Sequence, residues 1–125
     1  ALVRFPDVWS AAAAVAPVSD WRDYDTAYTE RYMERPAMNE SGYDETAPVR
    51  SVERIVDPFF LAWGLTDDNV HPVHSVRLVD AMIAAGRPVE VRVFPGRGHA
   101  IGDPPARIAL FGAMTEFFER HLASR

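Results

Sequence analysis

Short apolar runs and helically spaced apolar residues alternate through the second half of the chain. Residues 58–63 form a continuous apolar run closed by Gly64, which predicts a strand buried on both faces. Residues 89–94 alternate apolar and charged side chains, which predicts a strand covered on one face. Between them, residues 74–85 carry apolar side chains at helical spacing and stop at Gly86. Together they have the size of a right-handed parallel crossover unit.

The flanking segments extend the same alternation of strands and helices. Residues 103–122 predict a long helix with a wide apolar stripe packed on a sheet. Residues 11–18 are apolar and indicate a third buried strand, after which Asp20 is expected to cap a helix reaching Tyr32. Residues 35–54 are polar and are expected to be irregular. The order of elements predicts an α/β fold with parallel strands and flanking helices.

Composition narrows the classes of function. The 125 residues suit one ordinary domain, and 13 Lys+Arg against 18 Asp+Glu give a net charge of −5, which argues against a nucleic-acid partner. No apolar run approaches the ~20 residues that span a bilayer, so no membrane segment is expected. The absence of cysteine excludes disulfides, thiolate metal sites and a cysteine nucleophile, but leaves the compartment open.

Ionisable residues follow two of the predicted strands. Asp67 lies in the loop after the first and His99 in the loop after the second, so both are expected at one edge of the sheet. An acid followed by a histidine is the order of an α/β-hydrolase triad, in which the carboxylate orients the imidazole. The alternative, equally weighted on spacing alone, is an acidic turn that caps the following helix and an ordinary loop histidine.

Other interpretations of these loops are weaker. The run from Asp67 to His71 begins like a calcium loop, but the glycine at the sixth position and the later glutamate are missing. His71 and His74 are three residues apart without an evident third ligand, so no metal site is expected. The glycines at 96 and 98 do not complete a phosphate-binding or dinucleotide motif, and no cofactor is expected.

Four aromatic residues recur at spacings of three, four and four from position 21: Trp21, Tyr24, Tyr28 and Tyr32. On a helix they would share one face, and such a stripe usually belongs to the core. Buried tyrosine hydroxyls need hydrogen-bond partners, so a partly open aromatic pocket is the second interpretation.

Four runs of the sequence resemble the prolyl oligopeptidase family of serine peptidases, most closely the catalytic domain of its dipeptidyl peptidases. These runs are residues 15–21, 24–33, 64–71 and 96–99. The similarity covers nearly the whole chain. It implies an α/β-hydrolase fold in which Asp67 is the triad acid, His99 is the general base, and Asn69 holds a substrate carbonyl. The resemblance also implies a pocket for the residue before the cleaved bond, lined by Val18, Trp21, Tyr24, Tyr28 and Val70. The chain departs from the family pattern at Trp63, Pro72 and Ala100.

The triad serine is absent from this sequence. It would lie before Asp67 on a G-x-S-x-G turn, but the first glycine is Gly42, and no serine before Asp67 has the flanking glycines. The resemblance implies that the serine, the oxyanion-hole donors and a β-propeller domain lie upstream of Ala1, with residues 1–4 as the last turn of a helix. We therefore expect residues 1–125 to be the C-terminal part of a catalytic domain, inactive alone, with the N-terminal part of the enzyme and a peptide substrate as partners.

Several alternatives stay open at this point. The parent enzyme could instead be an acylaminoacyl-peptidase or oligopeptidase of the same family, or the chain could be a truncated or assembly module without catalysis. The resemblance implies a homodimer to which the C-terminal helix contributes, and a periplasmic or secreted parent is expected. An unpaired strand edge near Ala11 also favours association.

Overall fold

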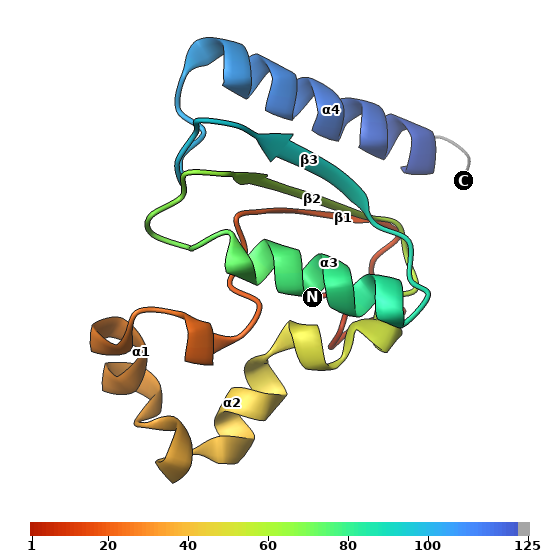
Figure 1. Cartoon of the computed structure of the whole chain (residues 1–125). Helices are drawn as coiled ribbons and strands as arrows, with labels where there is room; N and C mark the ends of the chain where they lie inside the picture. The colour runs from red at the N-terminus through yellow and green to blue at the C-terminus, as the bar shows by residue number, and fades with distance from the viewer. Residues whose placement is uncertain (123–125) are drawn as a thin grey trace.

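In the computed structural model, three parallel strands form one sheet with helices on both faces (Figure 1). The structure describes residues 1–122. The strands are β1 (Ala12–Val15), β2 (Phe59–Gly64) and β3 (Glu90–Phe94), in the order β1-β2-β3. Helix α3 (Val73–Ala84) lies on one face and α4 (Pro104–Leu122) on the other. The predicted α/β class with a parallel sheet and flanking helices is confirmed.

Strand β2 lies at the centre of the sheet, and every one of its residues is buried. Its side chains alternate between two apolar clusters because successive residues of a strand point to opposite faces. Leu61 and Trp63 pack with Leu78 of α3, whereas Phe60 packs with Phe117 of α4. This confirms that the run before Gly64 is a strand covered on both faces.

Strand β1 is shorter than the apolar run 11–18 that predicted it. It ends at Val15 because Ala16 adopts a left-handed φ of 46° and Pro17 has no N–H to continue the ladder. The amide of Ala16 makes the last bond to β2, to the carbonyl oxygen of Ala62 at 2.8 Å. The chain then turns away below the sheet toward the aromatic segment.

The single helix expected from Asp20 to Tyr32 is wrong, because two aspartates start two separate helices. Asp20 accepts the amide of Arg22 at 2.9 Å and caps a 3₁₀ helix, Trp21–Asp23. Tyr24 is extended, and Asp25 then caps α1 (Thr26–Met33) by accepting the amides of Ala27 and Tyr28.

The segment expected to be irregular contains a helix, α2 (Glu40–Thr46). Three 3₁₀ turns flank it: Pro36–Met38, Pro48–Arg50 and Val52–Arg54. The helix is anchored by Tyr43, which is 1% exposed and donates its hydroxyl to the carbonyl oxygen of Glu34 at 2.7 Å. This tertiary contact, together with the Arg22 guanidinium 5.2 Å from the centre of the Tyr43 ring, has no signal in local hydrophobic spacing.

Helix α4 packs on the sheet through a stripe narrower than expected. Leu110 and Phe117 are buried, but Phe111 is 55% exposed and Leu122 is 45% exposed. His121, near the end of the helix, lies with its Nε2 3.0 Å from Oε1 of Glu90 at the start of β3.

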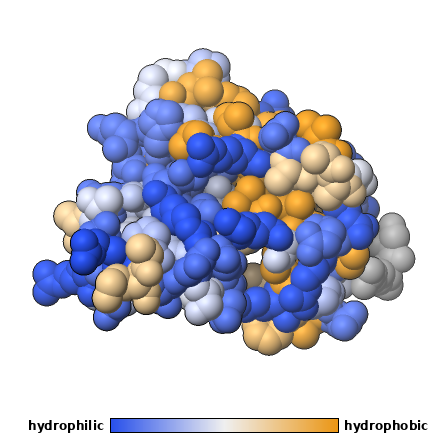
Figure 2. Space-filling view, turned by 60° about the horizontal axis from the view of Figure 1, so that its bottom comes forward, coloured by the Kyte–Doolittle hydropathy of each residue, from blue (hydrophilic) through white to orange (hydrophobic). Residues whose placement is uncertain are grey.

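The surface combines charged areas with exposed apolar side chains. Figure 2 shows hydrophobic patches among polar residues on the face that contains the lower side of Figure 1. Within residues 1–122, none of the helices has both the length and the apolar character needed to cross a bilayer.

Candidate active site

Two loops leave the carboxyl ends of β2 and β3 and meet at one edge of the sheet. The first contains Asp67 and the second His99, and Oδ2 of Asp67 lies 2.9 Å from Nδ1 of His99. A carboxylate only accepts hydrogen bonds, so Nδ1 of the imidazole carries the proton. The lone pair of the neutral ring is then on Nε2, which receives no hydrogen bond from any described residue. This is the tautomer required of a general base.

Asp67 is held rigidly by its own loop. Its side chain is 0% exposed, and Oδ1 accepts the amides of Asn69 at 3.0 Å and Val70 at 2.9 Å. These bonds cap the turn between β2 and α3 and leave Oδ2 for His99. The first turn of α3 instead uses Nδ1 of His71, which accepts the amide of Val73 at 3.2 Å. Asp67 therefore fixes its own turn and orients His99 at the same time.

The close approach of the two loops depends on Gly64. A Cβ added there would lie 2.0 Å from the carbonyl oxygen of Arg97, so only glycine fits where the second loop crosses the end of β2. Two bonds join the loops at this crossing: the amide of Leu65 donates to Phe94 at 3.1 Å, and that of Thr66 donates to Arg97 at 3.1 Å.

The His99 loop is closed at its base by an ion pair. Nε of Arg97 lies 3.0 Å from Oδ2 of Asp103, and the other oxygen of Asp103 accepts the amide of Ala106 at the start of α4. The hydrogen bond from Arg97 holds the pKa of Asp103 below its ordinary value. The His99 ring, 42% exposed, projects from this closed loop toward solvent.

The aromatic residues gather beside this edge although they come from two helices and the extended residue between them. The rings of Trp21 and Tyr28 stack with centroids 6.2 Å apart, and Tyr24 lies edge-on to both at 5.7 Å. Tyr28 and Tyr32 are more than half exposed, so the stripe is not a dry core. A cavity of about 190 Å³ is lined by Trp21, Tyr28, Thr29, Tyr32 and Met33. The residue pattern identified the rings, but not the participation of Thr29 and Met33.

One hydrogen bond connects the aromatic cluster to the Asp67 loop. The hydroxyl of Tyr24 donates to Oδ1 of Asn69 at 2.7 Å. The bond leaves the amide nitrogen of Asn69 as a donor for another group. Val70, also expected at the pocket, is buried at the end of the Asp67 turn.

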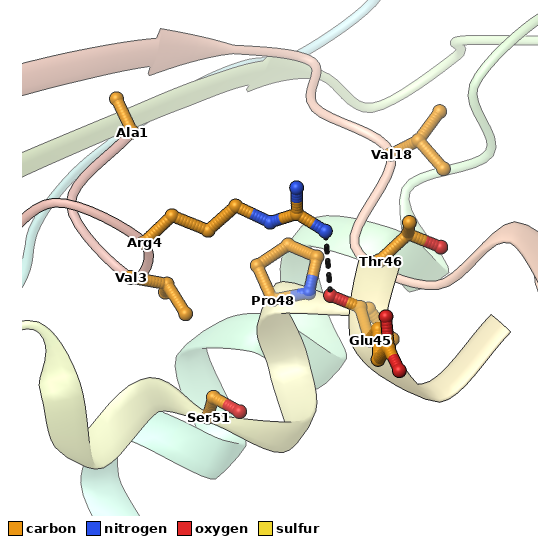
Figure 3. Close-up of a pocket in the computed structure, with 9 residues that line it drawn as sticks. Ala1, Val3, Arg4, Val18, Glu45, Thr46, Pro48 and Ser51 are labelled. Carbon is orange, nitrogen blue, oxygen red and sulfur yellow. Dashed lines mark hydrogen bonds between the residues drawn. The ribbon is translucent and has the colours of Figure 1, made fainter. Parts of the chain in front are cut away.

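Val18 faces a different cavity from the one beside the rings. It lines a space of about 340 Å³ together with Arg4 and Pro48, in which the guanidinium of Arg4 donates to the carbonyl oxygen of Glu45 at 3.4 Å (Figure 3). Residues 1–5 make a helical turn there, in which the amide of Phe5 donates a hydrogen bond to the carbonyl oxygen of Ala1. The structure therefore joins the rings to Asn69 through the hydroxyl of Tyr24, whereas Val18 lines a cavity apart from the rings.

A buried contact at this site, between Ser19 and His74, has no counterpart in the predictions from the sequence. Ser19 and His74 are each 0% exposed and are hydrogen-bonded to each other. They lie 55 positions apart, and nothing in either local pattern indicates the contact. Within residues 1–122, no group of three or more histidine, aspartate or glutamate side chains is arranged to hold a metal ion.

Comparisons with known proteins agree on a family. The model of the prolyl oligopeptidase family matches residues 1–125. A Schizosaccharomyces pombe protein named as a dipeptidyl aminopeptidase is 40% identical over 89% of this chain, and human dipeptidyl peptidase 8 is 33% identical over 100% of it. This chain spans 14% of the length of each.

Solved structures give the same result. The crystal structure of Porphyromonas gingivalis dipeptidyl peptidase 4 matches 97% of this chain with a TM-score of 0.93 and 31% sequence identity, and the match covers 17% of that chain. Both the sequence and the fold therefore identify this chain as a member of the prolyl oligopeptidase family of serine peptidases.

Proposed function

We propose that Asp67 and His99 are the acid and the general base of a serine-peptidase triad. The observation that carries the proposal is the 2.9 Å contact between Oδ2 of Asp67 and Nδ1 of His99, with the acid buried and the base open. Nε2 of His99 takes the proton of a serine hydroxyl as the hydroxyl attacks the peptide carbonyl. Asp67 stabilises the imidazolium that forms, and His99 then passes the proton to the leaving amine.

The substrate class follows from the neighbouring rings. Trp21, Tyr24 and Tyr28, with Val70 at the end of the Asp67 turn, would form a small apolar pocket for proline or alanine before the cleaved bond. Val18 lines a separate cavity and is left out of this proposed pocket. Asn69 accepts the hydroxyl of Tyr24 through Oδ1, so its amide nitrogen is free to donate to a substrate carbonyl. The dipeptidyl peptidase names of the relatives support removal of dipeptides from peptide N-termini.

The nucleophile belongs, in this proposal, to a longer enzyme of which residues 1–125 form the acid-and-base part of the catalytic domain. No serine before Asp67 lies in a G-x-S-x-G turn, and the relatives are several times longer than this chain. The β-propeller and the nucleophile turn would come from the rest of that enzyme. The chain alone then has no hydroxyl for His99 to activate and does not hydrolyse peptides.

The test compares the full-length protein, the 125-residue chain, and a His99→Ala variant of each, on a dipeptidyl-proline 4-nitroanilide. We expect the full-length protein to release nitroaniline and its His99→Ala variant to lose at least a thousandfold in kcat. The isolated chain should match its own His99→Ala variant. Turnover by the isolated chain above that of its own variant overturns the assignment of the nucleophile to another part of the enzyme. A loss of less than tenfold in full-length His99→Ala overturns the assignment of the base.

A further inference from the structure

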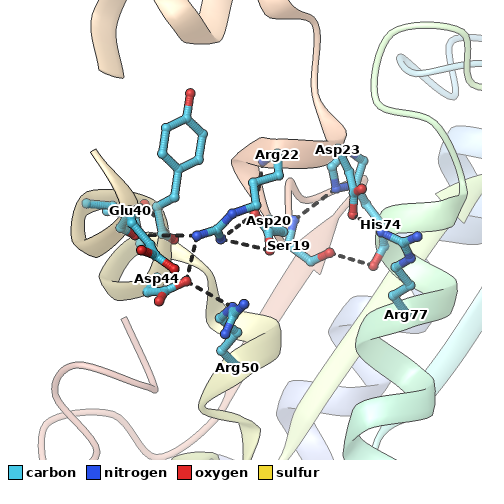
Figure 4. A network of polar contacts seen from close by, with 12 residues as sticks. Ser19, Asp20, Arg22, Asp23, Glu40, Asp44, Arg50, His74 and Arg77 are labelled. Carbon is cyan, nitrogen blue, oxygen red and sulfur yellow. Dashed lines mark hydrogen bonds and ion pairs between the residues drawn. The ribbon is translucent and has the colours of Figure 1, made fainter. Parts of the chain in front are cut away.

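A buried pair, Ser19 and His74, joins the two segments that carry the proposed pocket. Ser19 lies between Val18 and the helix that begins at Trp21, and His74 is four residues after Val70 in the first turn of α3. The amide of Ser19 donates to Nδ1 of His74 at 3.3 Å, and its hydroxyl donates to the carbonyl oxygen of His74 at 2.8 Å (Figure 4). Both side chains are completely buried.

Ser19 is fully committed to this junction. Besides its two bonds to His74, its carbonyl oxygen accepts the amide of Val49 at 3.3 Å. The backbone of Ser19 is therefore held from two sides. Because Val18 and Trp21 are close to Ser19 in the chain, the position of Ser19 determines where their backbones lie. Further out, Asp23 pairs with Arg77 of α3, and Tyr24 bonds to Asn69, but both contacts are exposed. The Ser19–His74 contact is the buried one of the three.

The imidazole of His74 acts in one defined chemical state. Because Nδ1 accepts an amide proton, the ring is neutral and its proton is on Nε2. Nε2 is buried and makes no hydrogen bond of good geometry among the described residues, although the backbone of Asp23 lies near enough to favour a proton on the ring. A residue needed only to fill this space would be better apolar, because a buried N–H without a well-formed hydrogen bond destabilises the folded state. The histidine therefore contributes an acceptor at Nδ1 that an apolar side chain cannot provide.

We propose that His74 is a positioning residue for substrate specificity: through Nδ1 it fixes Ser19, and thereby the distance between the aromatic wall at Trp21 and the Asn69–Val70 side of the pocket. The proposal rests on the proposed function of that pocket. His74 does not touch substrate, and its ring centroid lies 6.5 Å from that of Tyr24 on the buried side of the wall. Loss of the acceptor leaves the buried amide of Ser19 unpaired and releases the wall.

The charged groups around His74 are consistent with a neutral ring. Asp20 and Asp23 approach from the 3₁₀ helix, and Arg77 from the next turn of α3. Burial is the largest influence and lowers the pKa of His74 below its ordinary value, although the two aspartates act in the opposite direction. The acceptor is thus present at neutral pH.

The test uses the full-length protein with His74→Leu and His74→Asn. Leucine fills similar space without an acceptor, whereas the side-chain oxygen of asparagine reaches the position of Nδ1. For a dipeptidyl-proline substrate we expect His74→Leu to lower kcat/KM about tenfold, mainly through KM. For a dipeptidyl-alanine substrate, whose methyl group contacts less of the wall, the loss should stay below threefold. We expect His74→Asn to retain at least half of the wild-type proline-to-alanine ratio.

His71→Leu is the matched control, since this exposed histidine also accepts an amide through Nδ1, but within its own loop. It should leave the ratio unchanged. If His74→Leu leaves the proline-to-alanine ratio of kcat/KM unchanged, the proposal is overturned. It is also overturned if His74→Leu and His74→Asn lower this ratio equally. If His74→Leu does not fold, His74→Ala, which also removes the acceptor at Nδ1, takes its place and should shift the ratio in the same direction, and an unchanged ratio there also overturns the proposal. Failure of the wild-type protein to cleave either substrate overturns the proposed function instead, and the inference that rests on it.

Discussion

A methyl group at Gly64 should separate the acid from the base without altering either. The added Cβ would lie 2.0 Å from the carbonyl oxygen of Arg97, whereas real Cβ atoms stay at least 3.0 Å from such atoms. Because the obstacle is backbone, the two loops must separate by about 1 Å. The same displacement would lengthen the 2.9 Å contact between Asp67 and His99 to almost 4 Å, beyond hydrogen-bonding range. A misplacement of this size costs on the order of 100-fold in rate, or about 2.7 kcal/mol of transition-state stabilisation.

The assay is kcat/KM of full-length Gly64→Ala on a dipeptidyl-proline 4-nitroanilide. Gly102→Ala provides the control, because it makes the same change in the segment after His99, and its new methyl group meets nothing closer than Ala100 at 3.8 Å. We expect a loss of about 100-fold in the first variant and less than twofold in the second. A folded Gly64→Ala enzyme within threefold of wild type would refute the claim that the crossing at Gly64 sets the geometry of the pair.

Two other substitutions test separate contacts. In full-length Asp67→Asn, the amide would face Nδ1 of His99 and favour the tautomer with its proton on Nε2, so kcat should fall by on the order of 10³–10⁴; a loss under tenfold would contradict the assigned roles. Glu90 binds Arg120 and His121, and the hydrogen bond from His121 is the main reason that the pKa of Glu90 is lowered. A lowered carboxyl pKa stabilises the fold above the ordinary value near ~4.3, and this effect is lost as pH falls through the lowered pKa. Glu90→Gln should therefore cost about 0.5 kcal/mol of unfolding free energy near neutral pH for so exposed a pair, and the cost should shrink as the solution is made acidic. Thermal denaturation of both forms of the chain from neutral to acidic pH is the measurement, and a difference that does not shrink would be inconsistent with the pairing.

The crossover unit was predictable because its signals are local and agree with one another. The apolar run before Gly64, the helical spacing up to Gly86 and the alternation up to Phe94 each specify one element. Parallel strands joined by a crossover place their carboxyl ends at one edge, so proximity of Asp67 and His99 followed from order alone. The orientation of the imidazole could not be predicted, because it depends on the backbone approach at Gly64.

The connection between β1 and β2 was harder to predict because tertiary contacts decide it. Helix α2 has a glycine and few apolar residues, and it is stabilised by the burial of Tyr43. Asp20 and Asp25 are both good helix caps, and spacing alone does not show that each starts its own helix. The contact between Ser19 and His74 joins positions that are remote in sequence, and no local pattern predicts such a pair.

The crossing at Gly64 also has a consequence for motion. The amides of Leu65 and Thr66 bind the backbone of the following strand and loop, so the acid and the base belong to one mechanically coupled unit. Thermal displacement of this edge of the sheet would move Asp67 and His99 together and preserve the distance between them. In the proposed triad, the separation that fluctuates is then the one from Nε2 of His99 to the serine hydroxyl, and this separation would limit how often the reactive geometry is reached.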